Sequence, residues 1–189
     1  MRRAIAVAAF LLLAASGCGG SARGGSGLVT ADGQVGSLQI DLSKAANIVA
    51  FAGKPDIVTT GKTSWPGVPR YRALAYGCPH GMSLPRVDSC QTVYYVNVRT
   101  RRLTAFETRS PAFHTWGGVR PGMDQNTADR IVHETPQGPW NAIGEGGAAN
   151  ADDLIMPSTC RRVVSGRCRG KVQAFMLESR TNPIGLLFT

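Results

Sequence analysis

Cysteine is the residue type in this chain whose spacing points most clearly to a particular chemistry. Four of the five cysteines form two close pairs in the sequence, Cys78 with Cys90 and Cys160 with Cys168, and each pair encloses a loop-like stretch. An even number of such cysteines in an exported chain indicates disulfides; four allow three pairings, and this spacing favours the two local ones. Each bridge would stabilise the fold by about 2–3 kcal/mol. A zinc site built from Cys78, His80 and Cys90 would lack the Cys-x-x-Cys spacing of structural zinc sites, so we expect no metal.

The side chains that usually perform acid–base chemistry are present but are not arranged in a catalytic pattern. None of the three histidines, His80, His114 and His133, belongs to a His-Glu-x-x-His motif or lies beside a Gly-x-Ser-x-Gly turn. The acidic pair at residues 152–153 follows a loop rich in glycine and alanine, where a solvated loop is a simpler interpretation than a cation site. No spacing brings an acid, a base and a nucleophile together. We therefore expect a protein that is not an enzyme, with no catalytic residue and no cofactor.

Five aromatic residues are the candidates for contact with a partner. Trp65, Trp116 and Trp140 each adjoin a proline or glycine, outside the segments with regular patterns, and Tyr94 and Tyr95 lie on a predicted strand. Tryptophan and tyrosine in such positions either pack at the edge of a core or anchor a binding interface. We take these five as possible contacts with a protein partner that the sequence does not identify.

The N-terminus predicts export and a lipid anchor. Two arginines precede an uncharged apolar run at residues 4–15, which as a helix would rise about 18 Å and is too short to span a hydrocarbon core of about 30 Å. Residues 1–17 therefore fit a signal peptide. The sequence Ala15-Ser16-Gly17-Cys18 resembles the lipobox of bacterial lipoproteins, with Ala15 where that family usually has leucine. The resemblance implies that Cys18 becomes the first mature residue, carries acyl chains such as palmitate, and anchors the protein to the outer face of the cell membrane. An ordinary secretory signal is the alternative.

A flexible tether and a basic domain follow. Residues 18–27 are dominated by glycine and serine, and a coil formed by the nine residues after Cys18 has a reach of about 16 Å. The whole chain carries a formal net charge of +9. A basic exported surface favours anionic lipid headgroups or acidic wall polymers, unless its charge is simply dispersed and solvated. No nucleic-acid-binding motif is present, so we expect no nucleic-acid partner.

Signals for helices and strands recur with a period near 81 residues. The first helix is expected after Ser43 as N-cap and ends near Gly53; the second is expected after Asp124. Strands are expected at residues 92–98 and 103–106 in the first copy, and at 172–177 and 184–188 in the second. These patterns predict an α+β fold of two tandem similar units, at residues 28–112 and 113–189. Each unit would pack a short helical segment on an antiparallel sheet meander.

This order of elements, with one disulfide per unit, resembles the β-lactamase inhibitory proteins of actinobacteria. That family begins each helix with an approximate Gly-Met-Thr signature, which Gly122-Met123-Asp124 resembles in the second copy and residues 42–44 match more loosely in the first. The signature also occurs in small envelope lipoproteins of the outer-membrane barrel-assembly machinery. The family's inhibitory loop carries an aspartate just ahead of a tyrosine pair, whereas here Thr92-Val93 precedes Tyr94-Tyr95. The resemblance therefore implies a fold more than an activity.

Together these observations predict a cell-surface lipoprotein with a non-catalytic, protein-binding domain. Two alternatives stay open: an inhibitor of a secreted enzyme such as a β-lactamase, and an envelope-assembly or structural lipoprotein. The partner of the domain would separate these functions.

Overall fold

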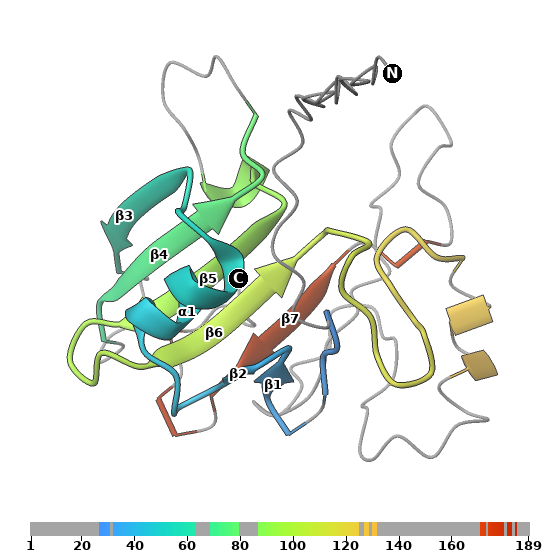
Figure 1. Cartoon of the computed structure of the whole chain (residues 1–189), viewed down its shortest axis with the longest axis horizontal. Helices are drawn as coiled ribbons and strands as arrows, with labels where there is room; N and C mark the ends of the chain where they lie inside the picture. The colour runs from blue at the N-terminus through green and yellow to red at the C-terminus, as the bar shows by residue number, and fades with distance from the viewer. Residues whose placement is uncertain are drawn as a thin grey trace, which may run out of the picture.

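The computed structural model has a mixed α+β architecture, with the eight-residue helix α1 beside two antiparallel sheets (Figure 1). The residues that it describes are 27–30, 32–62, 69–79, 87–124, 127–128, 130–131, 171–172, 174–179, 181–182 and 184. The α+β class expected from the sequence is confirmed at this level.

The described chain begins with a two-stranded hairpin. Strands β1 (Gln34–Val35) and β2 (Leu38–Gln39) pair antiparallel across a two-residue turn, in which Gly36 adopts a φ of 60°. A turn of this length favours positive φ, which glycine adopts without steric cost. Val35 and Leu38 are buried, so the hairpin closes one end of the core beside the following helix.

Helix α1 (Ala45–Ala52) lies close to its predicted position but begins one residue later. Lys44 is the N-cap, with Asn47 Oδ1 accepting a hydrogen bond from its backbone N–H at 2.8 Å. The prediction of Ser43 as the N-cap is wrong. Its Oγ instead accepts a hydrogen bond from the Gln39 N–H at 2.9 Å and stabilises the preceding turn. The helix ends at Gly53, as the sequence predicts.

A five-stranded antiparallel sheet forms the body of the molecule. Its strands lie in the order β3 (Ile57–Gly61), β4 (Tyr71–Tyr76), β5 (Thr92–Asn97), β6 (Leu103–Thr108) and β7 (Phe175–Glu178). The first four form a meander, and β7 adds to the edge of β6 from a point far along the chain (Figure 1). The strands predicted at 92–98 and 103–106 are thus present. The strand expected at 172–177 is observed a few residues later, and of the one expected at 184–188 only Ile184 is described.

The structure describes the first residues of the predicted second helix. Asp124 Oδ1 accepts from the Thr127 N–H at 3.0 Å, the Ala128 N–H donates to the Asp124 carbonyl at 2.9 Å, and residues 127, 128, 130 and 131 are helical. Asp124 therefore acts as the N-cap that the sequence predicts.

The sheet buries side chains on both faces because successive residues of a strand point to opposite sides. One face packs Leu74, Tyr94, Phe106 and Phe175 against Ile48 of α1. On the other face, a second cluster contains the buried residues Ala73, Ala75, Cys90, Val93, Tyr95, Ala105 and Ile184. Strand β5 is buried along its whole length and forms the centre of the core.

A disulfide and a group of side-chain hydrogen bonds to Asp41 hold the segments around this sheet together. A disulfide joins Cys78 and Cys90, whose Cα atoms are 4.0 Å apart, which is the local pair expected from the sequence. Asp41 accepts hydrogen bonds from Ser179 Oγ at 2.6 Å, Thr181 Oγ1 at 3.0 Å and Asn182 Nδ2 at 3.3 Å. The turn before α1 is thereby tied to the chain that leaves β7.

A cationic groove as the candidate functional site

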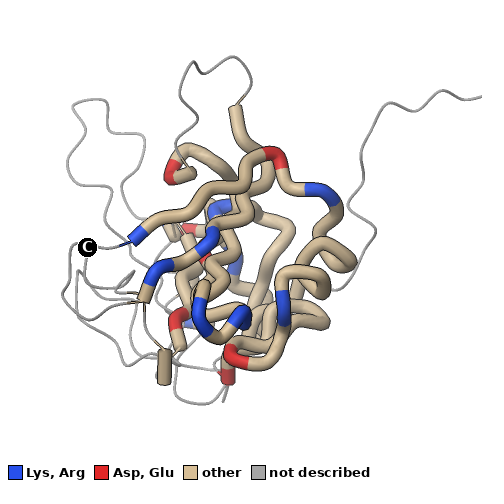
Figure 2. Tube along the Cα trace, turned by 90° about the vertical axis from the view of Figure 1, so that its left-hand side faces the viewer, with Lys and Arg blue, Asp and Glu red and all other residues tan. Residues whose placement is uncertain are grey.

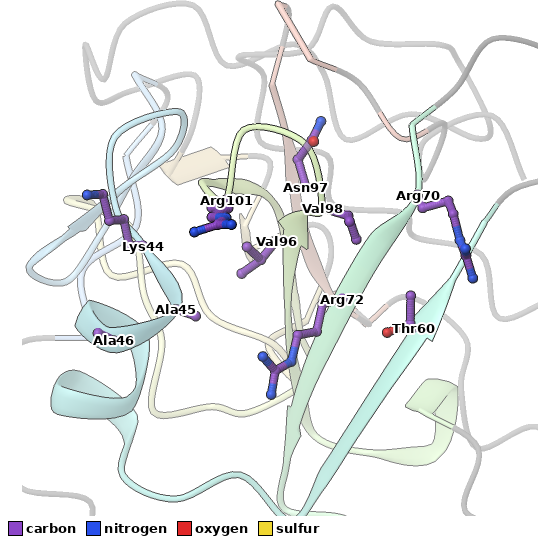
Figure 3. Close-up of a pocket in the computed structure, with 10 residues that line it drawn as sticks. All are labelled: Lys44, Ala45, Ala46, Thr60, Arg70, Arg72, Val96, Asn97, Val98 and Arg101. Carbon is purple, nitrogen blue, oxygen red and sulfur yellow. The ribbon is translucent and has the colours of Figure 1, made fainter.

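A groove with a volume of about 650 Å³ opens between the start of α1 and the sheet face that the helix covers. Its walls come from the first turn of α1, from β3 and β4, and from the end of β5 with the turn that follows (Figure 3). The described lining residues are Lys44, Ala45, Ala46, Thr60, Arg70, Arg72, Val96, Asn97, Val98 and Arg101.

Four of these lining residues are cations, and none of the described ones is acidic. Arg72 reaches from β4 toward α1 and Arg101 enters from the turn after β5, while Lys44 and Arg70 lie at opposite ends (Figure 3). Over the part of the chain that the structure covers, no ion pair is recorded for any of the four. Basic positions gather across this side of the molecule, with acidic ones nearer its rim (Figure 2). Like charges held together without counter-charges raise the free energy of the folded state.

Lys44 occupies a position where a cation is unfavourable. It is the N-cap of α1, and the first turn of the helix contains no acidic residue. The backbone dipoles place partial positive charge at this end, where side-chain oxygens of Ser, Thr, Asp or Asn usually stabilise the free N–H groups. A lysine side chain has no acceptor for these N–H groups, so an anion in the groove would provide the acceptor and the negative charge that the helix end lacks.

Arg101 is also held in an unfavourable conformation. Its φ is 59°, in the left-handed region that non-glycine residues rarely adopt. The turn around it is fixed by Asn97, whose Oδ1 accepts from the N–H groups of Arg99 at 2.8 Å and Thr100 at 3.1 Å. The Arg101 N–H donates to the Asn97 carbonyl at 2.8 Å, so the whole turn is rigidly tied to the end of β5.

The register of the sheet positions the remaining polar groups. Arg72 pairs with Val96 on one side and with Thr60 on the other, so all three side chains share the face covered by α1. The Val98 N–H donates to the Arg70 carbonyl at 2.9 Å, which brings the fourth cation to the same end of the sheet.

The groove can therefore bind an anionic group through charge-assisted hydrogen bonds. A guanidinium presents several donors in a planar fork that matches phosphate or carboxylate oxygens, and the small side chains of Ala45 and Ala46 leave room at the helix end. This site could not be predicted from local sequence patterns because its cations, at positions 44, 70, 72 and 101, are 26, 2 and 29 residues apart. A local signal was the alternate spacing of Arg70, just before β4, and Arg72 within it.

The aromatic residues predicted as partner contacts differ in their exposure to solvent. Tyr94 and Tyr95 are only 1 % and 5 % exposed, on opposite faces of β5, so their prediction as a contact surface is wrong. That prediction assumed one open sheet face, whereas residues on both faces of β5 are covered. Burial raises the pKa of both tyrosine hydroxyls. Trp116 is 71 % exposed and remains available for contact. Trp65, Trp140, Cys18, Cys160 and Cys168 lie outside the described residues.

An ion pair between a buried carboxylate and an exposed arginine lies on the sheet face opposite the groove. Glu107 Oε1 lies 2.5 Å from Arg109 Nη2, and Arg109 also donates to the Asp88 carbonyl at 2.8 Å. Burial raises the pKa of Glu107 above its ordinary value, against the opposing effect of Arg109. This pair connects β6 to the 3-10 turn η1 (Val87–Ser89) beside the disulfide and has a structural role.

Within the described ranges, no three His, Cys, Asp or Glu side chains gather as a metal site, and the disulfide occupies the sulfurs of Cys78 and Cys90. Those ranges also hold no helix with the length and apolar character needed to cross a bilayer. No protein-family model, curated protein or solved structure matches the chain.

Proposed function

We propose that this protein is an exported, lipid-anchored binding protein, without catalytic activity, whose cationic groove holds an anionic group of its ligand. The observation that carries the proposal is the groove itself: four cations surround about 650 Å³, and the described lining residues include no carboxylate. Lys44 and Arg101 support it further, because each occupies a position that lowers fold stability. Residues kept at a cost to stability are characteristic of functional sites.

The N-terminus supports the proposed location. The apolar run, the Ala15-Ser16-Gly17-Cys18 sequence and the glycine-rich tether occur in the order that a lipoprotein needs. The disulfide between Cys78 and Cys90 is consistent with an oxidising compartment. Under this proposal the domain works at the outer face of the membrane, within reach of soluble and membrane-bound anions.

The other functions expected from the sequence have less support. Inhibition of a secreted enzyme such as a β-lactamase would require an exposed loop around the tyrosine pair, and both tyrosines are buried. A role in envelope assembly would use a protein surface, for which the exposed Trp116 is the described aromatic candidate. Neither alternative accounts for the four clustered cations.

We further propose that the two units share one fold, and one structural parallel supports this. The N-cap Lys44 forms an antiparallel bridge with Arg102 just before β6, and the N-cap Asp124 forms one with Lys171 ahead of β7. The helix-side residues are 80 positions apart (124 minus 44) and the strand-side residues 69 (171 minus 102). The second unit would therefore return to the sheet 11 residues sooner than the first.

The test of the binding function uses inorganic phosphate as probe and the mature chain, residues 18–189 with Cys18→Ser. Phosphate at about ten times its Kd should raise the free energy of unfolding by about 1.4 kcal/mol. Chloride at equal ionic strength serves as the control for salt effects. The double variant Arg72→Gln/Arg101→Gln should lose most of this stabilisation, because it removes two guanidinium groups from the groove.

A matched variant, Arg120→Gln/Lys171→Gln, removes the same charge from exposed positions outside the groove. It should keep the phosphate effect. Equal stabilisation by phosphate in the groove variant and in the natural chain, or none in either, would refute the proposed function.

A further inference from the structure

Exposed aliphatic side chains surround the cationic groove. Over the described residues, five large hydrophobic side chains are exposed, and four of them lie on or next to groove-lining segments: Leu42 (63 %), Val49 (41 %), Val58 (45 %) and Val98 (47 %). The fifth, Trp116, is outside the groove segments. A site that binds only a small soluble anion has no need of this apolar rim.

The positions of these four side chains follow from the contacts around them. Val98 lines the groove directly, and Val58 lies two residues before Thr60 on the same face of β3. Val49 is one helical turn after Ala45 and Ala46.

Leu42 is held beside the turn that carries Arg101. Arg102 donates from Nη1 to the Asp41 carbonyl at 2.9 Å and forms a bridge with Lys44, so the segment that contains Leu42 runs alongside this turn. The aliphatic groups thus border a cationic centre from the helix, from β3 and from the turn after β5.

Such a combination matches the surface of an anionic bilayer. Lysine and arginine are attracted to lipid phosphates, while exposed aliphatic side chains enter the boundary between headgroups and acyl chains. A soluble polyanion would satisfy the cations but would leave the apolar rim in water.

The proposed lipid anchor adds a second reason. The nine residues at 19–27 reach about 16 Å, so the domain would stay beside the membrane that holds Cys18. A tether of this length gives a weak surface contact a high effective concentration.

We infer that the groove and its aliphatic rim form a membrane-docking face, on which anionic phospholipid headgroups occupy the cationic groove. This inference rests on the proposed function, since it names the source of the anionic group. The domain would lie with α1 and the β3–β4–β5 end of the sheet against the bilayer, leaving the Glu107 face turned away.

The test is vesicle flotation of residues 18–189 with Cys18→Ser, so that no acyl chain contributes. Vesicles of two parts phosphatidylcholine to one part phosphatidylglycerol are compared with vesicles of phosphatidylcholine alone. Each cation near an anionic surface strengthens binding about fivefold, so Arg72→Gln/Arg101→Gln should weaken partitioning into the mixed vesicles about 25-fold. Arg120→Gln/Lys171→Gln, with the same charge change, should partition nearly as well as the natural sequence.

A second variant separates a membrane from a soluble anion. Leu42→Gln/Val49→Gln keeps every groove cation, so it should bind inorganic phosphate like the natural chain but partition about fivefold less into mixed vesicles. Phosphate binding in the groove without any preference for the anionic vesicles would overturn the membrane inference while leaving the proposed function intact. Equal partitioning of the two charge variants would overturn it as well. Failure of both phosphate and vesicles to bind would refute both proposals.

Discussion

At Arg101, the need for a cation in the groove conflicts with the stability of the backbone. This residue adopts a φ of 59° in the turn after β5, where glycine or asparagine would fit without strain. Arg101 instead brings a guanidinium into the groove. The left-handed conformation costs about 1 kcal/mol, which we attribute to the need for a cation at this point.

Replacing Arg101 should therefore separate the two contributions. Arg101→Gly relieves the backbone strain but adds flexibility to the unfolded chain, so the net gain in unfolding free energy should be about 0.5 kcal/mol. Phosphate affinity should fall at the same time. Urea denaturation with and without phosphate measures both quantities, and a variant that is less stable yet binds normally would contradict the assignment.

Glu107 gives a residue-scale prediction on pH. Burial raises its pKa in the folded state above the ordinary value of 4.5, so the folded protein holds this proton more tightly than the unfolded chain. The associated stabilisation is complete below the unfolded pKa and is lost as pH rises through the folded pKa. Glu107→Gln, which stays neutral, should gain stability relative to the natural chain as pH rises above the ordinary glutamate pKa of 4.5. Denaturation midpoints measured as pH rises above this value would show the two curves diverging; parallel curves would mean that the carboxyl has no raised pKa.

At the scale of elements, local sequence patterns predicted where helices and strands lie, but they did not predict how distant segments pack together. The expected positions of α1, β5 and β6 came from a helical apolar stripe and from alternating β-formers, which depend only on neighbouring residues. The N-cap moved from Ser43 to Lys44 because the serine hydroxyl is used by Gln39. The burial of Tyr94 and Tyr95 depends on what covers each sheet face, and the groove depends on which strand ends meet; neither is encoded in a local pattern.

The attachment of β7 to the rest of the sheet is an element-scale feature with a clear test. Asp41 accepts three side-chain hydrogen bonds from the segment after β7, at Ser179, Thr181 and Asn182. Its φ of 63° suits aspartate or asparagine. Asp41→Ala removes the acceptor and should lower the free energy of unfolding by about 2 kcal/mol.

Asp41→Asn is the matched variant, because it keeps an oxygen acceptor and tolerates the same backbone conformation. It should lose less than half as much stability in the same urea denaturation. If both variants were as stable as the natural chain, the hydrogen bonds to the segment after β7 would have no part in holding the sheet together.

The whole chain carries a formal net charge of +9, and in our proposal an N-terminal export signal and a short tether precede its basic domain. In our account these parts act together, because the anchor keeps the groove close to the membrane. Cys18→Ala should leave the precursor uncleaved or release the protein from the membrane. Intact-mass measurement and detergent partitioning would test this, and an unmodified N-terminus at any residue other than 18 would contradict the anchor.

The groove as an anion-binding site is the central claim, and Lys44 provides its most direct test. Lys44→Asp places a capping carboxylate at the N-terminus of α1 and should raise the free energy of unfolding by about 1–2 kcal/mol. The same change puts a negative charge at the mouth of the groove and should abolish stabilisation by phosphate. The decisive measurement is the unfolding temperature of Lys44→Asp and of the natural chain, each with phosphate and with chloride at equal ionic strength. Our account predicts a higher unfolding temperature for the variant in chloride and no further increase in phosphate; an undiminished increase in phosphate would contradict it.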